Sequence, residues 1–213
     1  SNVTRLLPPR HRWWPQRNIA MTSRKVRKRF FSRSVHHVAP ELIGATLLIG
    51  GVGGRIVEVE AYHHTEPAAH SFNGETPRNA VMFGPPGHLY CYFTYGMHVC
   101  CNVVTGEVGV ASAVLLRAGE ITEGIELARA RRPGARDRDL ARGPARLCKA
   151  LGIELSDNGN DLVTGPVTLA PGTTPAEVST GPRVGLRGDP DRPWRFWLTG
   201  APTVSAYRRA VRR

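Results

Sequence analysis

Two acidic residues and a tyrosine alternate with apolar residues along the stretch GRIVEVEAY of this 213-residue sequence. Successive side chains of a β-strand point to opposite faces, so Glu58, Glu60 and Tyr62 are expected to share one face of a strand. The rise of a strand places the Cβ atoms of the two acids ~7 Å apart, similar to the carboxylate separation in sugar hydrolases. Three interpretations remain open: a catalytic pair, one catalytic acid beside a supporting one, and a solvated strand face, the commonest use of such a pattern.

An arginine interrupts the apolar run AVLLRAGE later in the chain. Burying Arg117 between Leu116 and Ala118 without a partner would be unfavourable, so we expect it to meet a carboxylate. Glu58 and Glu60 are its natural partners. The arginine then either forms a structural ion pair or organises a catalytic carboxylate.

An aromatic and β-branched run, HLYCYFTYGMHVCCNVV, is broken by one glycine. It predicts a β-hairpin with the sequence Tyr95-Gly96-Met97 near its tip. Tyr90 and Phe93 are expected to serve ordinary sheet packing. Large apolar side chains at an exposed tip indicate a partner instead, and on a basic protein they suggest a wedge between the base steps of a duplex.

The segment 63–87 is rich in Gly, Pro, Asn and His, and we interpret it as a long functional loop. A lone histidine such as His70 is more often packed or on the surface than a ligand or a base. His63 and His64 together with His70 raise the alternative of a metal site. No Cys-x-x-Cys or His-Glu-x-x-His pattern supports one, so we expect no metal.

The formal net charge of +12 and the pI near 10.5 predict attraction to polyanions, to nucleic acid before acidic membrane. Only three of the 29 basic residues are lysines, and an arginine bias of this kind also arises from GC-rich coding sequence. Part of the charge lies in SRKVRKRFFSR, which we interpret as a solvated arm. The charge therefore supports a nucleic-acid partner without identifying it.

The hydrophobic content of 41% suits one compact domain. No apolar run reaches the ~18 residues of a membrane helix, and the first residues lack the features of a signal peptide, so we expect a cytoplasmic protein. Residues 1–25 are interpreted as a disordered basic arm, or as sequence before a start at Met21. The four cysteines are expected to be buried free thiols.

The patterning predicts a helical entry around residues 30–37, Pro40 in a first helical turn, and a hairpin that turns at GGVGG. Further strands are expected in ASAVLLRAGE, LVTGPVTLAP and PWRFWLTG, and helices in EGIELARARR, capped by Thr122, and in GPARLCKALGI. The glycines of GGVGG precede a strand rather than a helix, which excludes a dinucleotide-binding fingerprint. Strands and helices without regular alternation argue for an α+β fold, one domain over residues 26–213 with a mixed or antiparallel sheet.

Several long and unusual stretches occur in a fixed order between about residues 29 and 206: ELIGATLL, GRIVEVEAY, AAHS, TPRN, MFGPPGHLYCYFTYGMHVCCN, VLLRA, GPARLCKALGI, PRVGL and PWRFW. Together they resemble the alkyladenine (3-methyladenine) DNA glycosylase family. The resemblance implies a curved sheet, flanking helices and a protruding β-hairpin that enters the minor groove of DNA.

The resemblance also implies roles for single residues. Glu60 matches the general base that activates a water to attack C1′ of the damaged nucleotide, and Arg117 matches the arginine that helps to hold this water. Tyr62, His70 and Tyr92 match the side chains that enclose the flipped-out base.

The DNA contacts are implied in the same way. Asn102 matches the residue beneath the purine that disfavours the 2-amino group of guanine. Tyr95 matches the minor-groove wedge, with Met97 and His98 beside it at the DNA interface. Arg146 resembles a contact to the phosphate backbone.

The implied activity is base excision repair by hydrolysis of the N-glycosidic bond of 3-methyladenine, 7-methylguanine, hypoxanthine or ethenoadenine. No lysine is placed for Schiff-base chemistry, so we expect a monofunctional enzyme, without a cofactor. The expected partner is double-stranded DNA with damaged purines, bound by a monomeric, nucleoid-associated bacterial protein. Two alternatives remain: a non-catalytic nucleic-acid-binding module, and a sugar hydrolase that uses Glu58 and Glu60 as its pair.

Overall fold

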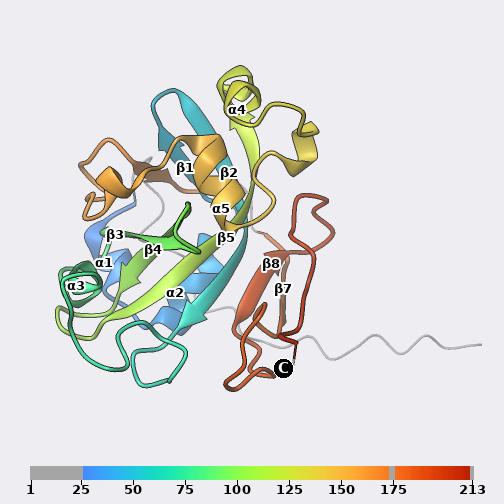
Figure 1. The fold of residues 1–213 in the computed structure, drawn as a ribbon. Coiled ribbons are helices and arrows are strands. Elements are labelled where there is room, and N and C mark those ends of the chain that lie inside the picture. The colour runs from blue at the N-terminus through green and yellow to red at the C-terminus, as the bar shows by residue number, and fades with distance from the viewer. Residues whose placement is uncertain (1–25, 173–175, 212–213) are drawn as a thin grey trace, which may run out of the picture.

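The computed structural model describes residues 26–172 and 176–211. The disordered arm expected at residues 1–25 lies outside this part of the chain. The described residues form an α+β unit around one eight-stranded sheet (Figure 1). None of its helices is both long enough and apolar enough to cross a bilayer.

The elements are short apart from two strands. The strands are β1 Thr46–Ile49, β2 Val52–Tyr62, β3 Leu89–Thr94, β4 His98–Thr105, β5 Ser112–Glu123, β6 Thr168–Ala170, β7 Val178–Gly181 and β8 Arg195–Leu198. The α-helices are α1 Lys28–Phe31, α2 Val35–Leu42, α3 Ala80–Phe83, α4 Ile125–Arg131 and α5 Pro144–Leu151, with 3₁₀ turns η1 Asp137–Asp139 and η2 Leu155–Asp157. All the strand pairs of the sheet are antiparallel.

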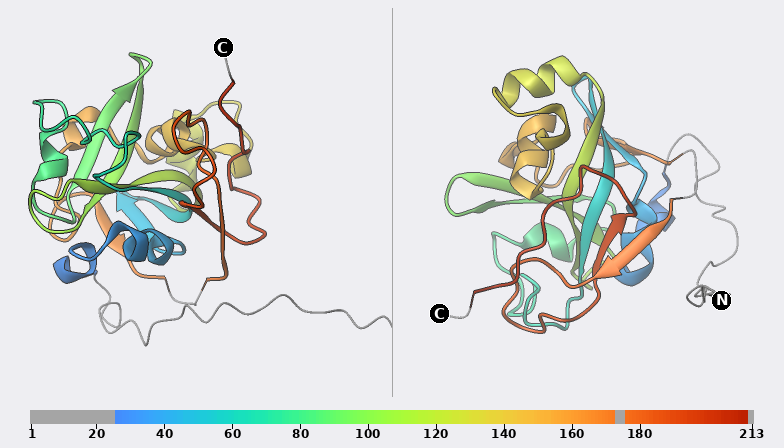
Figure 2. Two further views of the ribbon diagram at one scale, coloured as in Figure 1. Left: turned by 90° about the horizontal axis from the view of Figure 1, so that it is seen from below. Right: turned by 90° about the vertical axis from the view of Figure 1, so that its right-hand side faces the viewer.

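Strand β2, which carries GRIVEVEAY, is central to the sheet. One of its edges pairs with β5 along nearly the whole strand. Its other edge pairs first with β1 and then, over residues 58–60, with β8. The main order is β3-β4-β5-β2-β1-β6, and β7 continues the sheet from β8. The sheet curls around β2 (Figure 2), so the two acids lie where strands from both halves of the chain meet.

The expected hairpin at GGVGG is confirmed as the β1–β2 connection. Gly50 and Gly51 have φ angles of 53° and 82°. Two successive residues with positive φ define the type I′ turn that matches the twist of a hairpin, and glycine adopts it without steric conflict.

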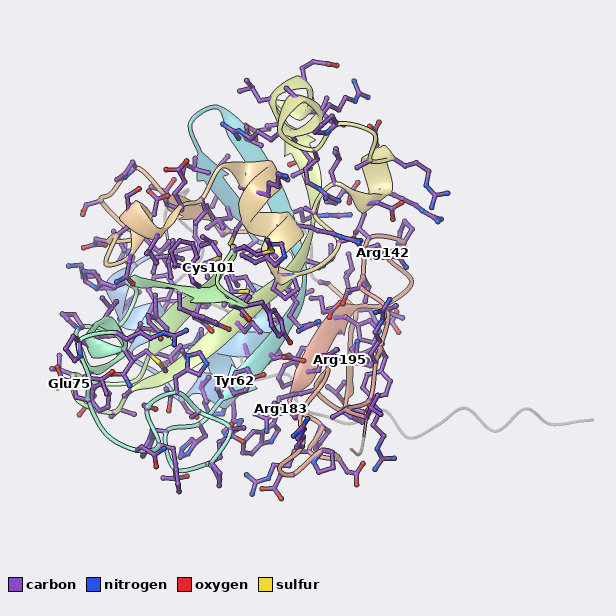
Figure 3. All side chains as sticks on the ribbon, in the orientation of Figure 1. Tyr62, Glu75, Cys101, Arg142, Arg183 and Arg195 are labelled. Atoms are coloured by element: carbon purple, nitrogen blue, oxygen red, sulfur yellow. The ribbon has the colours of Figure 1, made fainter. Side chains whose placement is uncertain are left out.

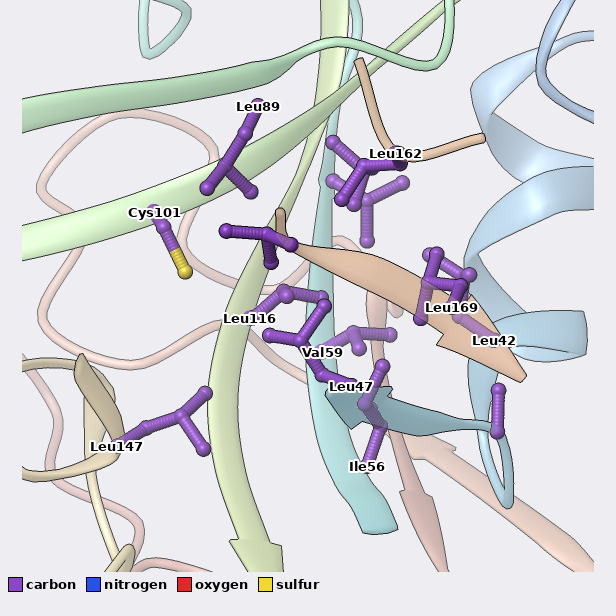
Figure 4. Packing of buried hydrophobic residues seen from close by; sticks show 14 of the residues in the cluster. Leu42, Leu47, Ile56, Val59, Leu89, Cys101, Leu116, Leu147, Leu162 and Leu169 are labelled. Carbon is purple, nitrogen blue, oxygen red and sulfur yellow. The ribbon is translucent and has the colours of Figure 1, made fainter. Parts of the chain in front are cut away.

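The larger of two apolar clusters joins the sheet to α1, α2, α4 and α5. It contains Leu42 of α2, Val59 and Leu116 of the central strands and Leu147 of α5 (Figure 4). All four cysteines are free and buried, as expected.

The basic stretch SRKVRKRFFSR is not a solvated arm in its described part. Val26, Phe30 and Phe31 are buried in the core. The arginines and lysines that alternate with them made the segment look uniformly polar, although the apolar side chains all turn inward.

Two expected helix starts are wrong. Ser34 caps α2 by accepting a hydrogen bond from the amide of His36, which places Pro40 in the last turn of that helix. Strand β5 extends through Thr122, and Gly124, with φ of 64°, precedes α4. A Cβ atom at Gly124 would lie 2.2 Å from the carbonyl oxygen of Gly51, so the close approach of two turns decides this boundary.

The aromatic hairpin consists of β3 and β4 and projects from the sheet (Figure 2). Strand β4 begins at His98, but its pairing with β5 begins only at Asn102. The outer part of the hairpin is therefore a two-stranded ribbon that does not pair with β5, although Arg78 donates a hydrogen bond to the carbonyl of Phe93 at 2.7 Å. Phe93 is 44% exposed on this ribbon, which corrects the expectation that it packs in the sheet.

Candidate active site

Two β-bulges flank Glu58 where β2 pairs with β5, one in each strand. The register with β5 passes from Ile56 to Glu58 and from Ala118 to Leu116, which leaves Val57 and Arg117 without a cross-strand partner. Bulges re-aim the side chains near them. Glu58 and Glu60 are both fully buried, so the interpretation of a solvated strand face is wrong.

Both carboxylate oxygens of Glu58 accept hydrogen bonds. Its Oε1 accepts hydrogen bonds from Arg117 Nε at 2.7 Å and from Ser205 Oγ at 2.8 Å. Its Oε2 accepts from the amide of Ser205 at 2.7 Å, and Arg195 Nη1 lies 3.9 Å from Oε1. The expectation that Glu58 pairs with an arginine is confirmed, and its surroundings are those of a supporting residue.

Glu60 has a different set of partners. Its Oε1 accepts from the Tyr62 hydroxyl at 2.9 Å and from Arg117 Nη1 at 3.4 Å. Its Oε2 accepts from the amide of Val184 at 2.6 Å. Arg117 thus joins the two carboxylates, with a short contact to Glu58 and a longer one to Glu60.

The charges of this cluster reinforce one another. Burial alone would lower the pKa of Arg117, but Glu60 and Glu58 outweigh it and raise that pKa above its ordinary value. Burial, together with the charge of Glu60, raises the pKa of Tyr62 well above its ordinary value. Tyr62 therefore remains a neutral phenol whose hydroxyl donates a hydrogen bond to the Glu60 carboxylate.

A pocket of about 130 Å³ adjoins this cluster. Its lining consists of Tyr62, Ala68, His70, Met82, Tyr90, Tyr92, Asn102, Ala113 and Leu186. One water molecule needs about 10–15 Å³ on this measure, so the pocket has room for a ring-sized ligand. The structure brings all four predicted base-binding residues, Tyr62, His70, Tyr92 and Asn102, into one cavity.

Neighbouring side chains fix the aromatic wall. The rings of His70 and Tyr92 meet edge to face with centroids 4.5 Å apart, and His70 Nδ1 lies 3.2 Å from the Tyr90 hydroxyl. Asn102 donates to the carbonyl of Tyr90 at 3.3 Å. Burial, and then the charge of Arg78, lowers the pKa of His70, so its imidazole is neutral at pH 7.

Histidine burial makes stability depend on pH. Burial lowers the pKa values of His36, His63 and His70 in the folded chain, whereas the unfolded chain titrates near pH 6.5. Below that pH the unfolded state binds more protons, so the free energy of unfolding should fall as the pH is lowered from about 7.5 to 5.5. Urea unfolding at both pH values measures this. The fall should be smaller in His36→Gln, and equal stability of the unmodified chain at the two pH values would contradict it.

A buried ion pair behind Tyr62 was missed by sequence reasoning. Arg183 donates to both oxygens of Glu66 at 2.6 Å and to the carbonyl of Ala61 at 2.8 Å. Its guanidinium lies 4.7 Å from the Tyr62 ring centroid and 5.0 Å from that of Trp194. Figure 3 shows Arg183 beside Tyr62. Arg183 belongs to the stretch PRVGL, which carried the resemblance but gave no sign that its arginine is buried.

The predicted DNA-contacting residues lie away from the pocket lining. Tyr95 at the hairpin tip is 92% exposed and Met97 72% exposed, with His98 exposed beside them. Arg146 is exposed on α5, which packs against β4 and β5. The structure thus brings together the predicted catalytic and base-binding residues and places the predicted DNA-contacting residues on the surface.

Comparisons with known proteins identify the family of this chain. The family described as methylpurine-DNA glycosylase matches residues 29–202. A protein of Rhodopseudomonas palustris (strain HaA2), named "Putative 3-methyladenine DNA glycosylase", is 56% identical over 180 residues, which cover 84% of this chain and 90% of the relative. Proteins of the same name from Streptomyces avermitilis and Nocardia farcinica are 52% and 54% identical, covering 85% and 82% of this chain and 91% and 87% of the relatives. The chain belongs to the methylpurine-DNA glycosylase family.

Proposed function

We propose that this chain removes alkylated or deaminated purines from double-stranded DNA by hydrolysis of the N-glycosidic bond, which leaves an abasic site. The observation that carries the proposal is a buried carboxylate, Glu60, held by Arg117 and Tyr62, with Tyr62 also lining the aromatic pocket. The proposed substrates are 3-methyladenine, 7-methylguanine, hypoxanthine and ethenoadenine. The names of the relatives support the first of these.

The pocket is suited to a nucleotide that has left the duplex. Flipping a nucleotide out costs a few kcal/mol, and stacking on aromatic side chains returns roughly 1–3 kcal/mol per base. Tyr62 on one side, with His70 and Tyr92 on the other, would enclose the base. Asn102 would then lie beneath the purine and disfavour a 2-amino group.

The neutrality of the pocket favours alkylated bases. Alkylation at N3 or N7 leaves a purine cationic, and cations are attracted to aromatic faces. The lowered pKa of His70 keeps its ring uncharged at pH 7 and so avoids repulsion of such a base.

The proposed reaction needs one carboxylate. Glu60 accepts a proton from a water that Arg117 helps to hold, the water oxygen bonds to C1′, and the glycosidic electron pair leaves with the purine. A cationic purine leaves without further protonation, whereas hypoxanthine and ethenoadenine must gain a proton. Glu58 is bonded to Arg117 and Ser205, which do not line the pocket, whereas Glu60 is bonded to Tyr62, which does. This difference disfavours the sugar-hydrolase alternative.

The hairpin tip is the proposed wedge that replaces the flipped nucleotide. Tyr95 has a φ angle of 51° although it is not glycine. Non-glycine residues at positive φ are uncommon and concentrate at functional sites. A strained backbone under a fully exposed aromatic ring favours a role in binding over a role in folding.

Tyr95→Ala should lower the affinity for lesion-containing duplex and the rate of base release from it by about tenfold each, because an unfilled gap in the stack lets the nucleotide return. Thermal unfolding should be unchanged or slightly improved. Val108→Ala, which truncates another exposed apolar side chain, is the matched control. Wild-type release by Tyr95→Ala would remove this tyrosine from the proposed role.

Arginines supply the proposed contacts to phosphate. Arg146 is exposed on α5, and the net charge of +12 would add non-specific attraction that weakens with salt. We propose that Met97 and His98 complete the interface beside the wedge. The protein would act as a monomer on the nucleoid.

Lysine chemistry is not part of the proposal. Lys28 forms an ion pair with Asp161 at 3.1 Å, and Lys149 is exposed on α5. Neither lines the pocket. With no lysine of residues 26–172 and 176–211 lining the pocket, we expect the enzyme to leave the DNA strand intact after it releases the base.

Release of free base from duplex oligonucleotides tests the proposal. Separate duplexes should carry 3-methyladenine, 7-methylguanine, hypoxanthine or ethenoadenine, with undamaged duplex as the control. The proposal requires base release from at least one lesion and an abasic product that remains uncleaved until alkali is added. Tight lesion binding without release would instead support the non-catalytic binding module.

A further inference from the structure

The segment Thr203–Arg209, here called the strap, follows the part of the chain that matches the family. It has no regular secondary structure and appears dark red beside β7 and β8 in Figure 1. Several contacts nevertheless hold it. Arg142 donates to the carbonyl of Val204 at 2.8 Å, and Arg195 lies over the ring of Tyr207 at 5.2 Å.

The strap reaches the catalytic cluster through Ser205. The amide and the hydroxyl of Ser205 provide two of the three short hydrogen bonds to the Glu58 carboxylate, and Arg117 provides the third. A carboxylate that accepts hydrogen bonds at both oxygens cannot rotate freely. Its orientation in turn fixes the side of the Arg117 guanidinium that faces Glu60.

The contact that depends on this orientation is the longer of the two hydrogen bonds that Arg117 makes to the acids. Arg117 Nη1 lies 3.4 Å from Glu60 Oε1, whereas Arg117 Nε lies 2.7 Å from Glu58 Oε1. If Ser205 released Glu58, the arginine would follow its closer partner. The longer contact to Glu60 would be the one lost.

The strap also supports the opposite side of Glu60. The carbonyl of Arg208 accepts a hydrogen bond from the amide of Gly185 at 2.9 Å. The preceding residue, Val184, donates its amide to Glu60 Oε2. The strap is therefore linked to both carboxylate oxygens of Glu60. It is linked to Oε1 through Glu58 and Arg117, and to Oε2 through Gly185 and Val184.

We infer that the strap is a positioning element of the catalytic centre and that Ser205 is its principal positioning residue. It acts through Glu58 on Arg117, and so on the carboxylate that activates water. The inference rests on the proposed glycosylase function.

Ser205→Ala tests the inference. It removes the hydroxyl bond and leaves the amide bond to Glu58. Loss of one hydrogen bond to a buried charge should lower the single-turnover rate constant of base release about tenfold, with the affinity for the same lesion duplex within about twofold. Ser205→Thr, which keeps the hydroxyl, should restore most of the rate. Ser179→Ala is the matched control, since this half-buried serine of β7 shares its hydrogen bond with Thr199 rather than with Glu58 or Arg117.

A second variant separates positioning from folding and from DNA binding. Ser205→Pro also removes the amide donor and should lower the rate constant about a hundredfold, and its melting curve shows whether it folds. Truncation after residue 202 is less informative, because the strap ends on the side toward which the hairpin projects (Figure 2) and carries Arg208 and Arg209.

The outcomes are distinguishable. Base release by the unmodified chain together with an unchanged rate in Ser205→Ala would overturn the inference alone. A fall in affinity equal to the fall in rate, or a slow Ser205→Thr, would also overturn it, because the serine would then serve binding or general packing. No base release by the unmodified chain from any lesion would overturn the proposed function, and this inference with it.

Discussion

Glu60→Gln is expected to lower the single-turnover rate of base release by about a thousandfold or more, because general-base catalysis contributes roughly 10²–10⁴-fold and the amide accepts no proton from water. The substitution keeps the shape of the side chain. Its amide group must point either at the Val184 amide or at Arg117 and Tyr62, all of which donate hydrogen bonds to Glu60. The affinity for lesion duplex, measured by titration under non-cleaving conditions, should stay within a few-fold.

Glu58→Gln is the matched control for this result. The same change two residues earlier retains one oxygen that can accept hydrogen bonds from Arg117 and Ser205, and it leaves the Glu60 carboxylate in place. It should therefore lower the rate far less than Glu60→Gln. Equal losses in the two variants would revive the carboxylate pair, and full turnover by Glu60→Gln would remove Glu60 from its role.

The sequence predicted the hairpins and the strand that carries the acids because their signals are local. Each hairpin turn is indicated within a few residues, one by the paired glycines at positions 50 and 51 and the other by the aromatic run around Gly96. The α+β class and the antiparallel sheet follow from the same signals. The confirmed family membership rests on long motifs rather than on composition.

The errors come from contacts between distant residues. The alternation in GRIVEVEAY predicts which side chains share a face, but not that segments more than a hundred residues later cover that face. Val184 and Ser205 supply those contacts by their main-chain amides, and a main-chain amide leaves no signal in a side-chain pattern. The bulge that leaves Arg117 without a cross-strand partner, beside Glu58, also depends on how the two strands pair.

The role of Glu58 shows how packing decides between interpretations of one pattern. A spacing of two residues on a strand is equally compatible with two catalytic acids and with one. The partners of each carboxylate distinguish the two acids. Glu58 is hydrogen-bonded to Arg117 and Ser205, whereas Glu60 is hydrogen-bonded to Tyr62, which also lines the pocket. The difference between the acids is therefore a property of the assembled sheet and of the segments that cross it.

Glu66→Ala is expected to destabilise the fold strongly, because it leaves Arg183 as an uncompensated buried charge. Both side chains of this pair are almost completely buried, 0% exposed for Arg183 and 2% for Glu66. Removing one partner of a buried ion pair costs about 3–5 kcal/mol of unfolding free energy, which lowers the melting temperature by roughly 10 °C in a chain of this size. Calorimetry or urea unfolding measures the loss.

A double variant and a surface control make this result specific. Glu66→Leu combined with Arg183→Met removes both charges and should recover most of the stability, since apolar residues of similar volume often replace a buried pair without loss. Glu120→Ala breaks the half-exposed pair with Arg55 and should cost no more than about 1 kcal/mol of unfolding free energy.

Because Arg183 also lies against the ring of Tyr62, the double variant should bind lesion duplex more weakly even where it is stable. Wild-type affinity there would show that Arg183 stabilises the fold without shaping the pocket, and a cost below about 1 kcal/mol for Glu66→Ala would contradict the ion-pair argument itself.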